Sequence, residues 1–217
     1  MNRAAAASLL ATVVAGSCVL EYAGERFVSS FPVKRQNQIF VVALGICAVA
    51  LAFFRSRVAV SDGCVLVVAL VAGMLLSRSL GSLGALCAML MVAATVDTVS
   101  TYAGLTRTLI VQAQHGHGEA VLRFLAVSVR LKGQPIAVIG VADLMFFTAC
   151  VSTLRRLGRP GIQALLAPLA GLLAALGVGL WTGATPALPF LAVGVLLYAG
   201  VTRQQTFQSN SASDRRT

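Results

Sequence analysis

The sequence predicts an all-α, polytopic transmembrane helical bundle. Of its 217 residues, 58% are hydrophobic and only 11% are charged. Its mean hydropathy of +0.86 is far above that of a soluble domain with a polar surface. Apolar stretches long enough to cross about 30 Å of hydrocarbon also recur along most of the chain. We therefore expect a multi-pass protein of about seven helices whose main partner is the lipid bilayer.

The expected spans follow one another with short polar connections. They lie at residues 4–22, 39–54, 58–76, 80–104, 134–154, 161–181 and 187–201. No soluble domain separates them, so residues 1–203 are expected to form one transmembrane domain. Its N-terminal helices occupy residues 1–78, and residues 79–203 form a second part that carries the candidate site. The polar tail, residues 204–217, is expected to be disordered.

The basic residues favour a membrane protein over a nucleic-acid-binding one. The net charge is +10, but Lys and Arg fall in the connections and the tail, where positive charge sets membrane orientation. Ten of these residues are expected on the face that carries the 155–160 connection and the tail, and seven on the other. This bias predicts a cytoplasmic C-terminus, with no nucleic-acid partner.

Neither the cysteines nor the histidines form a metal-binding pattern. The five cysteines are scattered singly, without a Cys-x-x-Cys pair or a His at ligand spacing, and are interpreted as small core residues. His115 and His117 lie in a Gly-rich segment that is interpreted as an exposed loop. We expect no metal and no cofactor.

Two acidic residues are expected inside the membrane. Asp97 lies in the fourth expected span and Asp143 in the fifth, whereas Glu21, Glu25 and the three other acids are placed at span edges, in loops or in the tail. Both aspartates are expected roughly 10–14 Å from the membrane face that carries the 105–133 connection. Without a basic partner in any span, they must be neutral or share one charge.

Two chemistries are open to such a pair. If the carboxyls meet across neighbouring helices, one can activate a water molecule while the other, protonated, hydrogen-bonds a scissile carbonyl group, as in aspartic proteases. Intramembrane acids also form proton or cation pathways, so a proton-coupled transporter is the alternative function.

A proline-containing element opens the last expected span on the same membrane face. Its four residues read Pro186, Ala187, Leu188 and Pro189. The two prolines lack amide donors, so a regular helix start is excluded and non-helical backbone is expected at membrane depth.

Together these elements resemble the presenilin and signal peptide peptidase family of intramembrane aspartyl proteases. The resemblance covers about residues 80–201 and includes "VDTVSTY" with Asp97, "GVAD" with Asp143, and "PALP". It implies a presenilin-like core, Asp97 and Asp143 as catalytic residues, and a transmembrane peptide or protein as substrate. It also implies substrate-binding roles for two segments: Gly140, Val141 and Ala142, and Pro186, Ala187, Leu188 and Pro189.

The chain departs from this family at two positions beside the aspartates. The family's Tyr before the first aspartate is Val96 here, and its second Gly is Ala142, which adds a methyl group next to the pair. The chain also has about seven expected spans where the family usually has nine. A type IV prepilin peptidase, whose aspartates follow a similar Gly-x-Gly-Asp pattern, would leave the proline-containing element unexplained.

The segment before the second aspartate alternates apolar and polar residues. Residues 127–133, "VSVRLKG", follow strand rather than helix periodicity. Such a strand could receive an unwound substrate by β-augmentation. The alternative, an interfacial amphipathic helix over residues 119–132 that contacts lipid phosphates, stays open.

Overall fold

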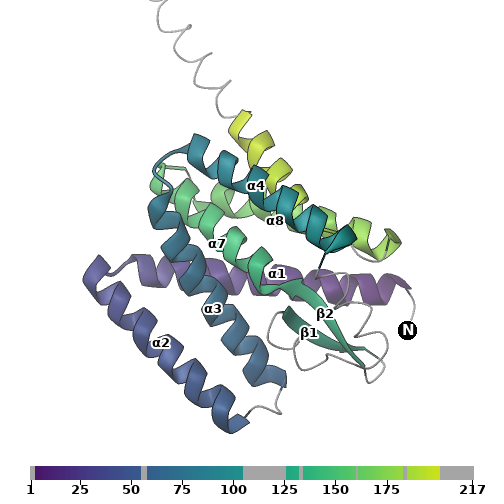
Figure 1. Ribbon diagram of the computed structural model, residues 1–217, viewed down its shortest axis with the longest axis horizontal. Helices are drawn as coiled ribbons and strands as arrows, with labels where there is room; N and C mark the ends of the chain where they lie inside the picture. Colours follow the sequence, from purple (N-terminus) through teal and green to yellow (C-terminus); the bar gives the residue numbers. More distant parts are fainter. Residues whose placement is uncertain are drawn as a thin grey trace, which may run out of the picture.

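The computed structural model shows a helical bundle with one small β-hairpin (Figure 1). It describes residues 3–54, 58–104, 126–131, 134–159, 161–182 and 185–200. The expected tail at 204–217 and the His115–Gly118 segment lie outside these residues. The expected helical bundle is therefore confirmed, with seven helices in the described part of the chain.

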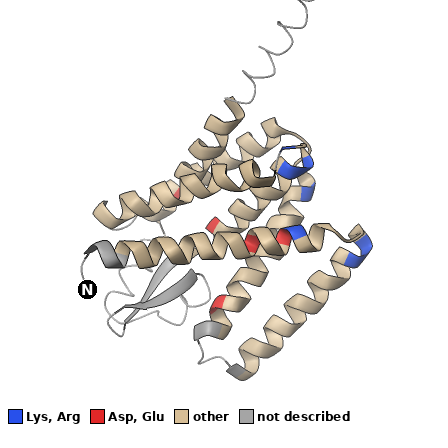
Figure 2. Ribbon diagram, turned by 180° about the vertical axis from the view of Figure 1, so that it is seen from behind, with Lys and Arg blue, Asp and Glu red and all other residues tan. Residues whose placement is uncertain are grey.

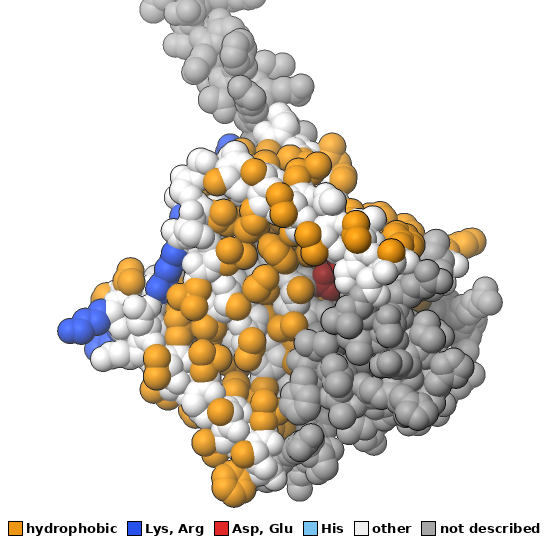
Figure 3. Space-filling view, in the orientation of Figure 1, with side chains coloured by type: hydrophobic (Ala, Val, Ile, Leu, Met, Phe, Trp, Pro, Cys, Tyr) orange, Lys and Arg blue, Asp and Glu red, His pale blue; other side chains and the backbone are white. Residues whose placement is uncertain are grey.

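The helices and strands follow in the order α1, α2, α3, α4, β1, β2, α7, α8 and a last, unlabelled helix. Their bounds are α1 Arg3–Ser29, α2 Val33–Phe54, α3 Val58–Ser79, α4 Leu83–Ala103, β1 Ala126–Leu131, β2 Gln134–Gly140, α7 Val141–Arg156, α8 Gly161–Thr182 and the C-terminal helix Leu188–Gly200. Five of them, α1 to α4 and α8, contain apolar segments long enough to cross a membrane. The surface in Figure 3 is largely apolar over the described helices, as a lipid-facing surface should be.

Two expected spans begin or end in the wrong place. The first was expected to end at residue 22, but α1 continues to Ser29 and carries Glu21 and Glu25 inside the helix. The second was expected from residue 39, but α2 begins at Val33. Both differences have one cause: polar residues mark the end of an apolar stretch, but a helix can extend beyond its apolar part where its polar side chains find partners.

The fifth expected span is not one helix. Residues 134–140 form strand β2, and α7 begins only at Val141. Pro135 lacks an amide donor, and Ile136, Val138 and Ile139 are β-branched residues that favour strands. β2 pairs antiparallel with β1, with an irregularity between Val127 and Ser128. The strand periodicity of residues 127–133 is thus confirmed for Ala126–Leu131, and the interfacial helix is excluded there.

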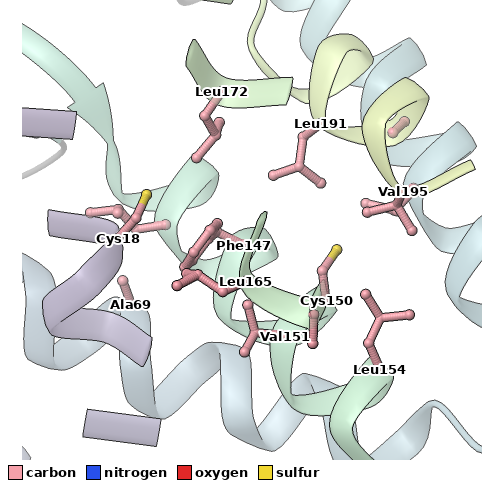
Figure 4. Close-up of a cluster of buried hydrophobic side chains, with 14 of the residues drawn as sticks. Cys18, Ala69, Phe147, Cys150, Val151, Leu154, Leu165, Leu172, Leu191 and Val195 are labelled. Atoms are coloured by element: carbon pink, nitrogen blue, oxygen red, sulfur yellow. The ribbon is translucent and has the colours of Figure 1, made fainter. Parts of the chain in front are cut away.

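Helix α7 lies at the centre of the bundle. It contacts α1, α3, α4, α8 and β2, and its contact with α3 is the most extensive between any two elements described. In Figure 4, Phe147, Cys150, Val151 and Leu154 extend from α7 into a core that Cys18, Leu172 and Leu191 complete from other helices. Because α7 also carries Asp143, the candidate site is attached to the most buried helix of the molecule.

Candidate functional site around Asp97 and Asp143

Asp97 lies in the second half of α4 and accepts two hydrogen bonds. The Thr101 hydroxyl, one helical turn later, donates to its Oδ1 at 3.5 Å. The backbone N–H of Leu188 donates to its Oδ2 at 3.0 Å. The second bond joins residues 91 positions apart and places the start of the C-terminal helix against α4. Asp97 itself is half-buried.

Asp143 lies in the first turn of α7, not deep within a helix as the sequence predicted. The backbone N–H of Gly140 donates to its Oδ2 at 3.0 Å. The first N–H groups of a helix have no partner within the helix, and the helix dipole favours negative charge there. A carboxyl group at this position therefore satisfies a backbone donor and benefits from the dipole, which explains how an acid is accommodated in an otherwise apolar segment.

The proline-containing element forms the turn that precedes the C-terminal helix. Residues 185–187 are not helical, as the element predicted, but the helix begins at Leu188, so Pro189 does not prevent a helix start there. Its first helical bond runs from the Leu191 N–H to the Ala187 carbonyl. Pro189 sits in the first turn, where its missing N–H removes no helical bond. The Leu188 N–H, which has no helical acceptor, donates to Asp97.

The structure brings Asp97 close to the proline-containing element and to the start of α7, which carries Asp143. α4 contacts α7, and the charge of Asp97 acts on the Asp143 carboxyl. Each carboxyl takes its backbone hydrogen bond from a different segment, Asp97 from Leu188 and Asp143 from Gly140. The arrangement therefore sets two acids from neighbouring helices near one another, beside the N-terminal ends of two helices.

The remaining candidate residues line the same two helix starts. Gly140 and Val141 are half-buried and Ala142 is exposed at the start of α7, whereas Pro186 and Leu188 are buried and Ala187 and Pro189 are half-buried. Val96 is 62% exposed. Because Ala142 and Val96 are both exposed, neither departure from the family pattern fills space in a helix interface. In Figure 3, acidic side-chain atoms reach the surface at one spot, where the apolar surface meets the residues that are not described.

Two buried acids on α1 were placed wrongly by the sequence. Glu21 and Glu25 are 2% and 3% exposed, not at the edge of a span. The Thr148 hydroxyl donates to Glu21 Oε2 at 2.7 Å, and the Ser152 hydroxyl donates to Glu25 Oε1 at 3.0 Å. Arg155 forms an ion pair with Glu25. We call these contacts between α1 and α7 the polar seam.

The sequence does contain a signal for the polar seam. Its acids continue a stripe of buried positions along α1 at helical spacing, made up of Val14, Ser17, Cys18, Glu21, Glu25 and Val28. The hydroxyl residues of α7 recur at the matching four-residue interval. The stripe identifies the buried face of α1, but the partner helix could not be identified from the sequence.

The described residues offer no metal-binding cluster, and the chain has no match among known proteins. Within the described ranges, no three His, Cys, Asp or Glu side chains gather closely enough to hold a metal ion. Comparisons with protein-family models, curated proteins and solved structures found no match to this chain.

Proposed function

We propose that this protein is an intramembrane aspartic endopeptidase that hydrolyses peptide bonds of transmembrane helices or signal-peptide-like segments. The observation that carries the proposal is the hydrogen bond from the Leu188 N–H to Asp97. It joins the proline-containing element to one of the two acids, and the other acid lies within reach of the first one's charge. In an aspartic protease this contact would hold the proline-containing element beside the two acids.

The proposed reaction needs the two carboxyl groups to hold one proton between them. Two like charges a few Å apart do not both ionise, so one acid is protonated and the other is not. The ionised acid draws a proton from a water molecule, which attacks the scissile carbonyl carbon, while the protonated acid hydrogen-bonds the carbonyl oxygen. The acid that took the proton from water then gives it to the leaving amine as the tetrahedral intermediate collapses.

In this proposal the β-hairpin receives the substrate. An endopeptidase that acts on a membrane helix must first unwind it, because helical hydrogen bonds cover its peptide groups. β1 and β2 form a two-stranded sheet that leads directly into the Asp143 helix. A substrate strand added to one edge would run toward the two acids. The proposed orientation, from the bias of basic residues, places the C-terminus in the cytoplasm and the hairpin outside.

Replacing each aspartate tests the proposal. Asp97→Asn and Asp143→Asn should each abolish cleavage of a model transmembrane substrate in proteoliposomes, because an amide cannot take a proton from water. Asp62→Asn, a matched change on α3, should leave cleavage unchanged. Full cleavage by either site variant, with the melting temperature of the parent protein, would rule out the proposed pair.

The polar seam favours one other candidate function. Five acids lie in described helices of the bundle, Glu21, Glu25, Asp62, Asp97 and Asp143, and Glu21 and Glu25 are buried. Buried acids in membrane helices often mark proton pathways. A proton-coupled transporter would move a solute into liposomes under a pH gradient. It would cleave no peptide, so the two assays on one preparation separate the candidates.

A further inference from the structure

The ends of α3 and α7 bring three guanidinium groups to one side of the molecule. Figure 2 shows that Lys and Arg of the described chain gather at the end of the bundle where α1, α3 and α7 terminate. Arg78 lies in the last turn of α3, and Arg155 and Arg156 lie in the last turn of α7. Arg156 follows Arg155, which forms an ion pair with Glu25 of α1, and α3 packs along α7. These groups therefore share one neighbourhood, which we call the arginine cluster.

The helices converge there because α3 and α7 run side by side at close range. A Cβ atom on Gly73 of α3 would lie 2.5 Å from the Met145 carbonyl oxygen and 2.7 Å from Thr148 Cβ of α7. Only glycine allows this approach. It sets Arg78 near Arg156 although like charges repel.

The arginine cluster contains more positive than negative charge. Its one carboxylate, Glu25, forms an ion pair with Arg155. Arg78 instead donates to neutral amide oxygens, Gln36 Oε1 and Asn37 Oδ1, each at 2.7 Å, and lies 5.4 Å from the centre of the Phe40 ring. Three guanidiniums and one carboxylate leave two positive charges, on Arg78 and Arg156.

Arg78 and Arg156 offer two positive charges that no carboxylate of the arginine cluster neutralises, as an anion site requires. The amides and the ring hold Arg78 in position without neutralising it, and planar guanidiniums form paired hydrogen bonds with phosphate oxygens. Arg156 is exposed and has no ion-pair partner among the described residues. An anion between them would relieve the repulsion that their proximity imposes.

We propose that the arginine cluster binds the headgroup phosphate of an anionic phospholipid. The ends of membrane-crossing helices lie at the level of the lipid phosphates. Exposed apolar side chains adjoin both arginines: Leu75, one turn before Arg78, is 47% exposed, and Leu157, next to Arg156, is 39% exposed. A lipid would place its phosphate on the guanidinium groups and its acyl chains on these apolar side chains. A free anion would contact the guanidinium groups alone.

Native mass spectrometry of the full-length protein in detergent tests this proposal. With phosphatidylglycerol and phosphatidylcholine of equal chain length added at equal concentration, retained phosphatidylglycerol should exceed phosphatidylcholine by about tenfold. Arg156→Gln should remove most of this preference. Because Arg156 is exposed, this variant is expected to fold normally, whereas Arg78→Gln also loses two hydrogen bonds and serves as the second variant.

The control is Arg35→Gln, which removes one charge from the same end of the bundle at the exposed start of α2. It should keep the preference within about twofold, because diffuse surface charge contributes little to a specific site. Equal retention of the two lipids, an unchanged preference in Arg156→Gln, or an equal loss in Arg35→Gln would each overturn the proposal. Displacement of phosphatidylglycerol by inorganic phosphate at the same concentration would also overturn it, because the site would then bind a free anion.

Discussion

Glu21 and Glu25 show how side-chain partners determine where an acid can be buried. They lie one helical turn apart on α1 and face the same helix, α7, but their partners differ. Glu21 accepts a hydrogen bond from a neutral hydroxyl group, whereas Glu25 accepts one from a hydroxyl group and forms an ion pair with Arg155. Each acid is therefore accommodated by one or two specific groups of α7 and not by solvent.

The two glutamates make a matched pair for mutation. Glu21→Gln should change the free energy of unfolding by less than about 1 kcal/mol, because the amide oxygen still accepts the Thr148 hydrogen bond. Glu25→Gln should cost about 1–2 kcal/mol, since it leaves Arg155 without its counter-ion, although Arg155 is 26% exposed and can reach water. Unfolding in detergent with increasing denaturant measures both, and equal losses would contradict the assigned partners.

Two substitutions separate the role of the Leu188 N–H from that of the Leu188 side chain. Leu188→Pro and Leu188→Ala both lose the buried side chain, but only proline also loses the amide donor to Asp97. Proline is tolerated in the first turn of a helix, so the fold should survive. We expect Leu188→Pro to lower cleavage at least about tenfold below Leu188→Ala, because a hydrogen bond to a charged group contributes about 1.5–3 kcal/mol. Equal activities would show that this bond has no role in the reaction.

At the scale of elements, the two shortest helices both begin at the site. α7 has 16 residues and the C-terminal helix runs from Leu188 to Gly200; at 1.5 Å per residue they span about 24 Å and about 20 Å, less than the hydrocarbon thickness. Non-helical segments precede both: strand β2 before α7 and the proline-containing turn before the last helix. Asp97 and Asp143 therefore accept hydrogen bonds from the Leu188 and Gly140 N–H groups where two helices start inside the bundle.

The C-terminal helix is held in place by close contact with α8. A Cβ atom on Gly171 would lie 2.5 Å from the Phe190 carbonyl oxygen, and one on Gly194 would lie 2.6 Å from the Ala167 carbonyl oxygen. Both glycines therefore allow the two backbones to approach closely, as small residues do in membrane helix pairs. The contact of Gly171 with Phe190 and Leu191 lies within a turn of Leu188 and helps to position the Leu188 N–H group.

Gly171→Ala should therefore disturb both the packing and the site. We expect a loss of about 1–3 kcal/mol in the free energy of unfolding, because the methyl group forces two backbones apart, together with lower cleavage as Leu188 moves from Asp97. Gly177→Ala on the same helix is the control, since a Cβ atom there meets nothing within 4 Å. Unfolding and cleavage assays on both variants check this, and a control as damaging as Gly171→Ala would contradict the assigned contact.

The spacing of residues predicted some elements and missed others. Apolar length located the helices, the alternation in residues 127–133 predicted strand β1, and Pro186 and Pro189 predicted the interrupted start of the last helix. Strand β2 was missed, because Ile136, Val138 and Ile139 are as apolar as a membrane helix and periodicity does not separate the two. The close contacts at Gly73, Gly171 and Gly194 depend on neighbours that the sequence does not identify.

At the scale of the whole molecule, α7 links the site, the core and the arginine cluster. Asp143 lies in its first turn, buried side chains such as Phe147 and Leu154 fill its middle, and Arg155 and Arg156 lie in its last. The resemblance to a known family indicated that Asp97, Asp143 and the proline-containing element belong together. Which atoms meet is a property of the packed bundle, so neither the Leu188 bond nor the helix that partners α1 in the polar seam could be predicted from spacing.

The most direct measurement for the proposed function is cross-linking of α4 to α7 at the two acids in lipid. The Asp97→Cys/Asp143→Cys variant, oxidised in proteoliposomes, should form a disulfide that peptide mass spectrometry identifies, because a disulfide requires Cα atoms about 4.4–6.8 Å apart and side-chain motion extends this reach by little. The Thr95→Cys/Asp143→Cys variant should not form a disulfide, because position 95 is rotated about 200° around α4 from position 97. Efficient linkage of the first pair alone is the predicted result; no linkage, or equal linkage of both pairs, would contradict a shared site for Asp97 and Asp143.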